Sequence, residues 1–343
     1  MIIIDGSYGE GGGQILRYAA SLAAAAGEKV KVINIRANRP NPGLRPQHLG
    51  GLKLLHEICG GDVSGLKIGS KEVVLKYDYP KAGRYYYDVG TAGSVTLVMQ
   101  TLLPVLSCGK GRFEVTLVGG TDVKWSPTID YFRHVFMWNL SKFGVKGRIE
   151  LIKRGYYPRG GGRVKLVVDG AEGKFKKVDF TRASIIATKV ISVCSNLPSH
   201  IASRQIEAVK FKLEQLSIGS TEYLVEVNGP DKAFGKGTSI VIYSEMENSI
   251  RCGGDSIGEK GKPAESVGWD AYQRYLEWYN STAALDRFMG DMVIPYIFLA
   301  GGGNFSAPIL TKHMESALYV AKTILGINFQ VIQGESRVDV MIG

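Results

Sequence analysis

The sequence is poor in cysteine and has no long apolar run. Its four cysteines, Cys59, Cys108, Cys194 and Cys252, are scattered and form no Cys-x-x-Cys pair, so neither disulfides nor a zinc site is expected. No hydrophobic stretch reaches the roughly 18 residues of a membrane span, and the opening Ile-Ile-Ile-Asp is typical of a strand rather than of a signal sequence. We therefore expect a cytoplasmic protein with buried free thiols and no membrane partner.

The composition is that of an ordinary globular protein with an excess of basic over acidic residues. The 343 residues are 45% hydrophobic and 22% charged, which is enough for a full core and, by length, for two domains. The formal net charge is +10. This charge favours a polyanionic partner without identifying it, because basic surfaces also arise for other reasons.

Three stretches share one plan, in which an apolar helix is followed by an amphipathic helix that ends at a glycine, and then by strands. The helix pairs are expected at 14–26 and 46–59, at 94–106 and 128–143, and at 286–299 and 311–325. The first helices begin 80 residues apart in units one and two, but 192 apart in units two and three. The excess of 112 residues predicts an insertion of domain size.

The inserted α/β domain is predicted to span residues 180–279, with strands near 184–194, 222–227 and 239–244 and helices near 203–216 and 266–280. Residues 1–179 and 280–343 then form a discontinuous main domain. Strands that alternate with helices predict an α/β architecture in which helices cover the sheets. A cleft between the repeated units is the expected place for a ligand.

The segment 9–17, Gly-Glu-Gly-Gly-Gly-Gln-Ile-Leu-Arg, places four glycines in five positions. Glycines permit positive φ and let backbone N–H groups converge on an anion, and the following helix adds positive potential at its N-terminus. The same segment contains three polar side chains, those of Glu10, Gln14 and Arg17. We interpret it as a phosphate site, with a turn that serves only close packing as the alternative.

The segment 35–49 holds three arginines, Arg36, Arg39 and Arg45, in ten residues, followed by Gln47 and His48. Guanidinium groups match phosphate oxygens in a bidentate geometry. A solvated basic loop is the alternative. Polar or loop residues at the ends of other expected elements should converge with these arginines: Gln100, Thr121, Asp122, Pro127, Asp291 and His313.

Four longer motifs follow one another along the chain. They are Asp5-Gly6-x-x-Gly9-Glu10-Gly11-Gly12-Gly13-Gln14-Ile15-Leu16-Arg17, Arg36-x-x-Arg39-x-x-Pro42-Gly43-Leu44-x-x-Gln47-His48-Leu49, Gly119-Gly120-Thr121-Asp122 and Tyr157-Pro158-x-Gly160-Gly161-Gly162. Together they resemble the RNA 3'-terminal phosphate cyclase family over essentially the whole chain. The resemblance implies three βαβαββ units, as in enolpyruvyl transferases, with a small α/β domain inserted before the third.

The resemblance also implies a ligase-class activity in RNA processing. An RNA 3'-terminal phosphate would become a 2',3'-cyclic phosphate at the expense of ATP, through a covalent histidine-AMP and an RNA-adenylate. The adenylated histidine of the family matches His313. Thr311 is expected to cap the last helix and to place His313 in its first turn, where the positive helix end favours the neutral ring.

The implied cofactors are ATP and a divalent cation, Mg²⁺ or Mn²⁺, with Glu10 as the metal ligand. The implied nucleotide site comprises Gln100, Pro127, Ile257, Phe288, Asp291 and His313. The implied contacts to RNA or phosphate are Gln14, Arg17, Arg36, Arg39, Arg45 and Gln47. Phe288 and Ile257 replace a tyrosine and another aromatic residue of relatives, so the nucleotide preference is open, although an apolar contact to a base survives both changes.

Three alternatives compete with this hypothesis. A catalytically inactive ribosome-assembly member of the family would be expected to lack His313. The histidine in the last unit and the single insertion are not expected for an enolpyruvyl transferase. A protein that only binds RNA would carry aromatic signatures that this sequence lacks.

Among the other histidines, His48 is the next candidate nucleophile, although a contact to RNA suits it better. His134 is expected to pack in the interior or to face solvent. The physiological RNA, the adenylation of 5'-phosphates and a homo-oligomeric state stay open.

Overall fold

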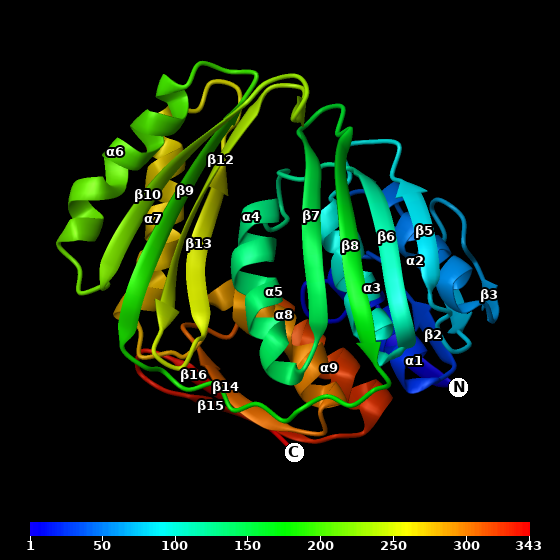
Figure 1. Ribbon diagram of the computed structural model, residues 1–343. Coiled ribbons are helices and arrows are strands. Elements are labelled where there is room, and N and C mark those ends of the chain that lie inside the picture. The colour runs from blue at the N-terminus through cyan, green and yellow to red at the C-terminus, as the bar shows by residue number, and fades with distance from the viewer.

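The computed structural model describes all 343 residues as four β-sheets with helices packed on them (Figure 1). The α/β class predicted from the sequence is confirmed. No helix is long and apolar enough to cross a membrane. All four cysteines are buried and free, as expected.

The N-terminal sheet has the strand order β1-β2-β4-β3. In chain order its elements are β1 (Ile2–Asp5), α1 (Gly13–Ala26), β2 (Val30–Ile33), α2 (Pro46–Cys59), β3 (Asp62–Ser64) and β4 (Val73–Lys76). Strands β1 and β2 are parallel, and the other pairs are antiparallel. The glycine-rich segment therefore joins the end of β1 to the start of α1, and the arginine-rich segment joins β2 to α2.

Four strands of the five-stranded second sheet repeat this order as β5-β6-β8-β7, with β5 and β6 parallel and the other two pairs antiparallel. Its strands and helices are β5 (Gly83–Asp88), α3 (Val95–Cys108), β6 (Lys110–Gly119), α4 (Ile129–Tyr131), α5 (Met137–Leu140), β7 (Lys146–Gly155) and β8 (Gly162–Ala171). A π-helical turn, Phe132–Phe136, and a final 3-10 turn, Ser141–Phe143, complete the helix expected at 128–143.

The C-terminal sheet has the order β14-β16-β15. Its elements are α8 (Arg287–Leu299), β14 (Gly303–Ala307), α9 (Lys312–Leu325), β15 (Phe329–Gln333) and β16 (Val338–Ile342). The chain that follows the second sheet runs beside β14, where the N–H of Phe180 donates to the carbonyl of Asn304 at 2.8 Å. It lies on the side where the first two sheets carry β1 and β5. A threefold repeat stays a prediction.

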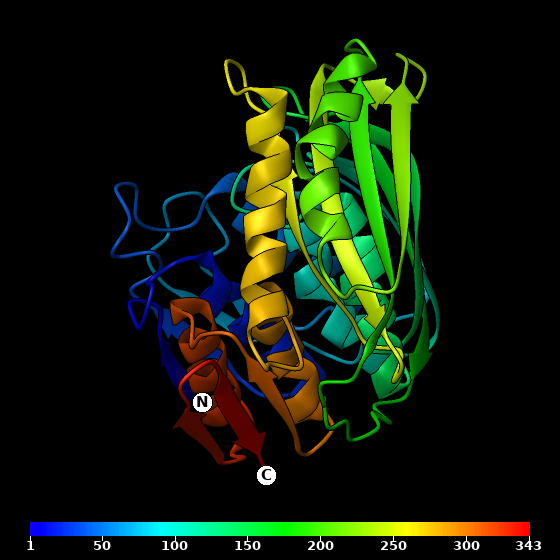
Figure 2. The same cartoon turned by 90° about the vertical axis from the view of Figure 1, so that its left-hand side faces the viewer.

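The fourth sheet, β10-β9-β12-β13, is covered by two helices on one face (Figure 2). Its elements are β9 (Ile185–Ser195), α6 (His200–Glu214), β10 (Ser220–Asn228), β12 (Gly237–Met246), β13 (Arg251–Ile257) and α7 (Ala264–Asn280). A short strand, β11 (Ala233–Phe234), lies between β10 and β12 in the chain. It is not part of this sheet and pairs with β7 of the second sheet. The boundaries 180 and 279 of the inserted domain stay predictions.

Helices α1, α3, α8 and α9 pack against one another in the interior of the molecule. Their apolar faces belong to one continuous cluster of 85 buried residues. Burial of that much apolar surface is the main force that holds the helices together. As a result, residues from far-apart parts of the sequence meet at the starts of α1 and α9.

Candidate functional site

His313 lies at the start of α9, as predicted. It is the second residue of the helix, and the Oγ1 atom of the N-cap Thr311 accepts a hydrogen bond from the N–H of Met314 at 2.9 Å. The Nδ1 atom of His313 lies 2.7 Å from Oε2 of Glu10. Because a carboxylate accepts hydrogen bonds, this contact assigns the ring proton to Nδ1 and leaves Nε2 with its lone pair.

The electrostatic surroundings favour the neutral imidazole. Burial lowers the pKa of His313 below its ordinary value; the carboxyl of Asp291 opposes the shift, and the cations Arg17 and Arg39 reinforce it. A neutral ring with a free Nε2 is the nucleophilic form of histidine. The ring is also half-exposed, so a substrate can reach it.

Glu10 lies in the glycine-rich segment and contacts two elements. Its Oε2 faces His313 and its Oε1 forms an ion pair with Arg39. A side chain on Gly12 would crowd this pair, because a Cβ atom there would lie 3.1 Å from Nη2 of Arg39 and 3.2 Å from Oε2 of Glu10. Gly12 therefore lets a carboxylate and a guanidinium meet over the start of α1.

Glu10 offers a single carboxylate, so a metal ion bound there would have to take most of its ligands from elsewhere. The structure contains no group of three or more His, Cys, Asp or Glu residues that could hold a metal ion. Magnesium is commonly bound by one or two carboxylates, with water and phosphate oxygens filling the other positions. A metal at Oε1 of Glu10 would compete with Arg39 for that oxygen. The assignment of Glu10 as a metal ligand stays a prediction.

Three further arginines surround His48. Burial lowers the pKa of His48 to about 3, and the positive charges of Arg17, Arg36 and Arg45 contribute to the shift. None of these three arginines has a carboxylate partner, in contrast to Arg39. The Nε atom of Arg17 and the Nδ1 atom of His48 are buried without a hydrogen-bond partner. A group of cations with no counter-charge and an unsatisfied donor is suited to an anion.

The start of α1 packs directly on this group. A Cβ atom on Gly13 would lie only 2.1 Å from Nε2 of His48, so only glycine allows the contact. Gln14, the next residue, is buried, whereas Gln47 on α2 is half-buried. His48 is thus a neutral packing residue beside the arginines, which argues against it as the nucleophile.

The predicted nucleotide residues Gln100, Pro127 and Asp291 are connected through α3 and α8. Asp291 accepts a hydrogen bond from Oγ1 of Thr311, and burial raises its pKa to about 7. The Nε2 atom of Gln100 donates to Sδ of Met292 at 3.0 Å. One turn before Gln100, Oγ1 of Thr96 donates to the carbonyl of Pro127 at 3.1 Å.

Phe288 lies at the start of α8 and Ile257 at the end of β13. The Phe288 ring meets Tyr131 edge-on, with centroids 6.1 Å apart, and the guanidinium of Arg274 lies 5.6 Å from its centroid. Two residues before Ile257, the carboxylate of Asp255 accepts a hydrogen bond from the N–H of Thr128 at 2.7 Å. This bond ties β13 to the residue that follows Pro127.

The sequence analysis missed Asp255 and Arg274. Arg274 donates to the backbone carbonyl of Asp255 at 2.6 Å, so the two residues connect β13 with α7 below Phe288. The available signal was a charged residue, Asp255, inside a strand whose neighbours are small or apolar. Such a residue needs a partner, but its partner on α7 could be found only in three dimensions.

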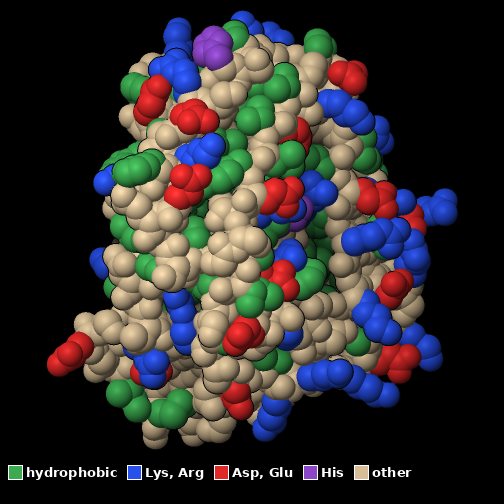
Figure 3. Space-filling model, turned by 60° about the vertical axis from the view of Figure 1, so that its left-hand side comes forward, with side chains coloured by type: hydrophobic (Ala, Val, Ile, Leu, Met, Phe, Trp, Pro, Cys, Tyr) green, Lys and Arg blue, Asp and Glu red, His purple; other side chains and the backbone are tan.

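On the surface, the face shown in Figure 3 carries a hollow in which acidic, basic and histidine side chains gather. In this α/β fold, a histidine suited to nucleophilic attack, His313, lies near Arg17, which has no carboxylate partner, and this arrangement is typical of proteins that act on phosphate groups. The family model described as RNA 3'-terminal phosphate cyclase matches residues 8–331. The chain belongs to the RNA 3'-terminal phosphate cyclase family.

Similar proteins support this membership over most of their lengths. An RNA 3'-terminal phosphate cyclase of Desulfurococcus amylolyticus is 46% identical and covers 93% of this chain and 90% of its own. One from Staphylothermus marinus is 45% identical, and the match covers 95% of this chain and 92% of the relative. One from Pyrococcus furiosus is 44% identical, and the match covers 97% of this chain and 96% of the relative.

Proposed function

We propose that this protein is a cytoplasmic ligase that converts the 3'-terminal phosphate of RNA into a 2',3'-cyclic phosphate and consumes ATP. Family membership supports the overall reaction. The single observation that carries the chemistry is the placement of His313, whose ring is half-exposed, contacts Glu10 through Nδ1 and lies in surroundings that favour its neutral form. Four buried free cysteines agree with a reducing compartment.

In the first step, Nε2 of His313 attacks the α-phosphorus of ATP and pyrophosphate leaves, so that AMP becomes bonded to the histidine. Positive charge develops on the ring, and the carboxylate of Glu10 at Nδ1 stabilises it. A bound Mg²⁺ or Mn²⁺ would neutralise charge on the phosphates, with Glu10 as its carboxylate ligand. Gln100, Pro127, Ile257, Phe288 and Asp291 would form the nucleotide pocket.

In the second step, an oxygen of the RNA 3'-phosphate attacks the phosphorus of AMP, the bond to His313 breaks, and an RNA-adenylate forms. In the third, the neighbouring 2'-hydroxyl of the RNA attacks the activated terminal phosphorus and AMP leaves. Both steps require a terminal phosphate held in line, since positioning supplies much of the rate. We assign this role to Arg17, Arg36 and Arg45, which lie near His48 and lack a carboxylate partner, together with Arg39, Gln14 and Gln47.

Transfer of label from α-labelled ATP tests the proposal. The wild-type protein should acquire acid-labile, hydroxylamine-sensitive label, and His313→Ala should acquire none. The variant should keep its fold because the side chain is half-exposed at a helix end and contributes little packing. The labelled protein, given RNA with a 3'-phosphate, should then release AMP and yield a phosphatase-resistant RNA end.

Two results would contradict the proposal. Label retained in a folded His313→Ala variant would place the nucleophile elsewhere. A wild-type protein that binds RNA but acquires no label at any ATP or metal concentration would instead support the alternative of a catalytically inactive, ribosome-assembly type of relative.

A further inference from the structure

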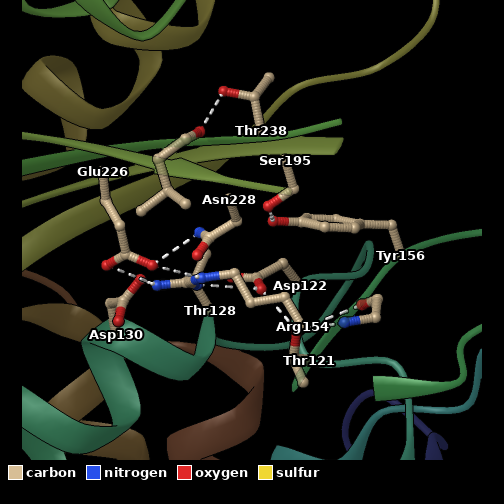
Figure 4. Close-up of polar contacts among 12 residues, drawn as sticks. Thr121, Asp122, Thr128, Asp130, Arg154, Tyr156, Ser195, Glu226, Asn228 and Thr238 are labelled. Carbon is tan, nitrogen blue, oxygen red and sulfur yellow. Dashed lines mark hydrogen bonds and ion pairs between the residues drawn. The ribbon is translucent and has the colours of Figure 1, made fainter. Parts of the chain in front are cut away.

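The loop 122–128, between β6 and α4, is rigidly held at its first end. The carboxylate of Asp122 is fully buried and accepts hydrogen bonds from Oγ1 of Thr121 at 2.6 Å and from Nη1 of Arg154 at 3.4 Å. Arg154 also donates to Asp130 at 2.8 Å (Figure 4). Breaking a buried, paired charge is costly, so this end of the loop is fixed.

The second end of the loop is fixed by the inserted segment. The N–H of Thr128 donates to the buried carboxylate of Asp255 at 2.7 Å. Inside the loop, Oγ of Ser126 donates to the carbonyl of Val123 at 2.9 Å, and the Val123 side chain is buried. The loop therefore has anchors at both ends and an internal hydrogen bond, and its tip has a defined position.

At the tip stands Trp125, which is 94% exposed. Its backbone φ is 61°, in the left-handed region that residues other than glycine rarely adopt. An indole in water contributes almost no burial energy to folding, and a strained backbone on a fixed loop is typical of functional segments. The fold thus holds a large aromatic surface in solvent at an energetic cost.

The surroundings of Trp125 add positive charge and a second aromatic ring. The Nζ atom of Lys124 lies 6.0 Å from the Trp125 ring centroid and also pairs with Glu259. A backbone bridge between Asp122 and Tyr156 places the next loop alongside. On that loop Tyr157 is 80% exposed, and Arg159 is exposed as well.

We infer that Trp125 is a stacking platform for a base of the RNA substrate close to its reacting 3' end. Exposed aromatic rings interleaved with cations bind single-stranded nucleic acid, because every base offers a π-face and every linkage a phosphate. The loop continues directly into Pro127 and Thr128, which contact α3 and β13 beside the proposed nucleotide pocket. The inference rests on the proposed function and extends it to the RNA strand upstream of the terminal phosphate.

The test compares Trp125→Ala and Trp125→Phe with the wild type. A short single-stranded RNA with a 3'-phosphate and a fluorophore on its 5' end is titrated without ATP, and binding is measured by anisotropy. Loss of one base stack should weaken binding roughly 5- to 150-fold in Trp125→Ala, and phenylalanine should restore part of it. Phe211→Ala is the matched control, since Phe211 is a 68% exposed aromatic on α6, far from this loop in sequence.

Abasic RNAs identify the base involved. When the abasic position coincides with the stacked base, wild type and Trp125→Ala should bind equally, whereas other abasic positions should preserve their difference. If Trp125→Ala binds every RNA as tightly as Phe211→Ala does, the inference is overturned.

Self-adenylation with ATP alone provides the second readout. A loss of self-adenylation as large as the loss of RNA binding would place Trp125 over the adenine of ATP instead, and would also overturn the inference. RNA binding is measured without ATP, so it does not depend on adenylation. A protein that fails to adenylate would contradict the proposed function, but the comparison of RNA binding between wild type and Trp125→Ala would still test the inference.

Discussion

The carboxylate of Glu10 has two neighbours of different kinds, a neutral histidine and an arginine. Glu10→Gln should reduce self-adenylation about 10- to 100-fold and raise the metal concentration required, because the amide keeps an acceptor for Nδ1 of His313 but carries no charge. The measurement is a titration of label transfer with Mg²⁺ and Mn²⁺. His313→Ala sets the background rate, and an unchanged metal requirement would refute the assignment of Glu10 as a metal ligand.

Asp291 makes the stability of the protein depend on pH. Burial raises its pKa to about 7, from 3.8 for an ordinary Asp. Between these two values the folded state holds a proton that the unfolded state has lost, so this group's contribution to stability falls as the pH rises from about 4 to 7. The stability of Asp291→Asn relative to the wild type should therefore be greater at pH 8 than at pH 5, by about 2.7 kcal/mol, because two pH units between 5 and 7 each contribute about 1.36 kcal/mol.

Denaturant unfolding of wild type and Asp291→Asn at the two pH values measures this difference. A difference in the free energy of unfolding that is equal at pH 5 and pH 8 would show that Asp291 has an ordinary pKa. Asp286→Asn is not a suitable control, because burial raises the pKa of Asp286 to about 6 as well. Asp179, an exposed residue that accepts a hydrogen bond from the N–H of Asn304, is a better one.

At the scale of elements, the arginine-rich segment between β2 and α2 contributes to two different places. Arg39 reaches the glycine-rich segment and pairs with Glu10, whereas Arg36 and Arg45 lie near His48. In the proposed mechanism, adenylation needs ATP, a metal and His313, whereas the later steps must also hold the terminal phosphate of RNA. We expect the segment to serve chiefly those later steps.

Arg39→Ala, and to a lesser degree Arg45→Ala, should impair cyclisation of RNA 3'-phosphate far more than self-adenylation. Each lost phosphate contact should also reduce the slope of log affinity against log salt by about one unit. Both half-reactions are measured on the same preparations. Equal losses would place Arg39 at the phosphates of ATP, and no loss in either would indicate a solvated surface loop.

At the scale of the whole molecule, Arg154 joins three parts of the fold. From β7 it reaches Asp122 after β6, Asp130 in α4 and Glu226 on β10, the last at 3.2 Å (Figure 4). Arg154 and the two aspartates are buried, and Glu226 is partly exposed. One guanidinium thus connects the second sheet to the fourth sheet, which contains β10.

Arg154→Met should lower the free energy of unfolding by about 3–5 kcal/mol, because it leaves the carboxylates of Asp122 and Asp130 buried without their cation. Glu226→Gln should cost about 1 kcal/mol or less, since that partner is in contact with water. Urea denaturation measures both. A cost for Arg154→Met no larger than that for Glu226→Gln would show that the buried ion pairs contribute little to joining these parts.

Local sequence patterns were enough to predict several helices and the family of the protein. Periodic apolar residues and terminal glycines predicted the helices from 46–59 and 311–325 closely, because amphipathic spacing and capping are local properties. The cap Thr311 and the helical position of His313 follow from the same rule. The glycine and arginine motifs also carried the family resemblance that the comparisons confirm.

Only the tertiary structure decided which groups meet. The contact between Glu10 and His313 spans 303 positions of the chain, and the bonds of Asp255 to Thr128 and of Arg154 to Glu226 join segments that no local pattern relates. The sequence also gave no reason to single out Trp125, whose exposure depends on two buried carboxylates that hold its loop. The burial of a side chain depends on packing between distant segments. The pKa values of the buried groups and the lack of carboxylate partners for some arginines depend on the same packing, so they become defined only when the chain is folded.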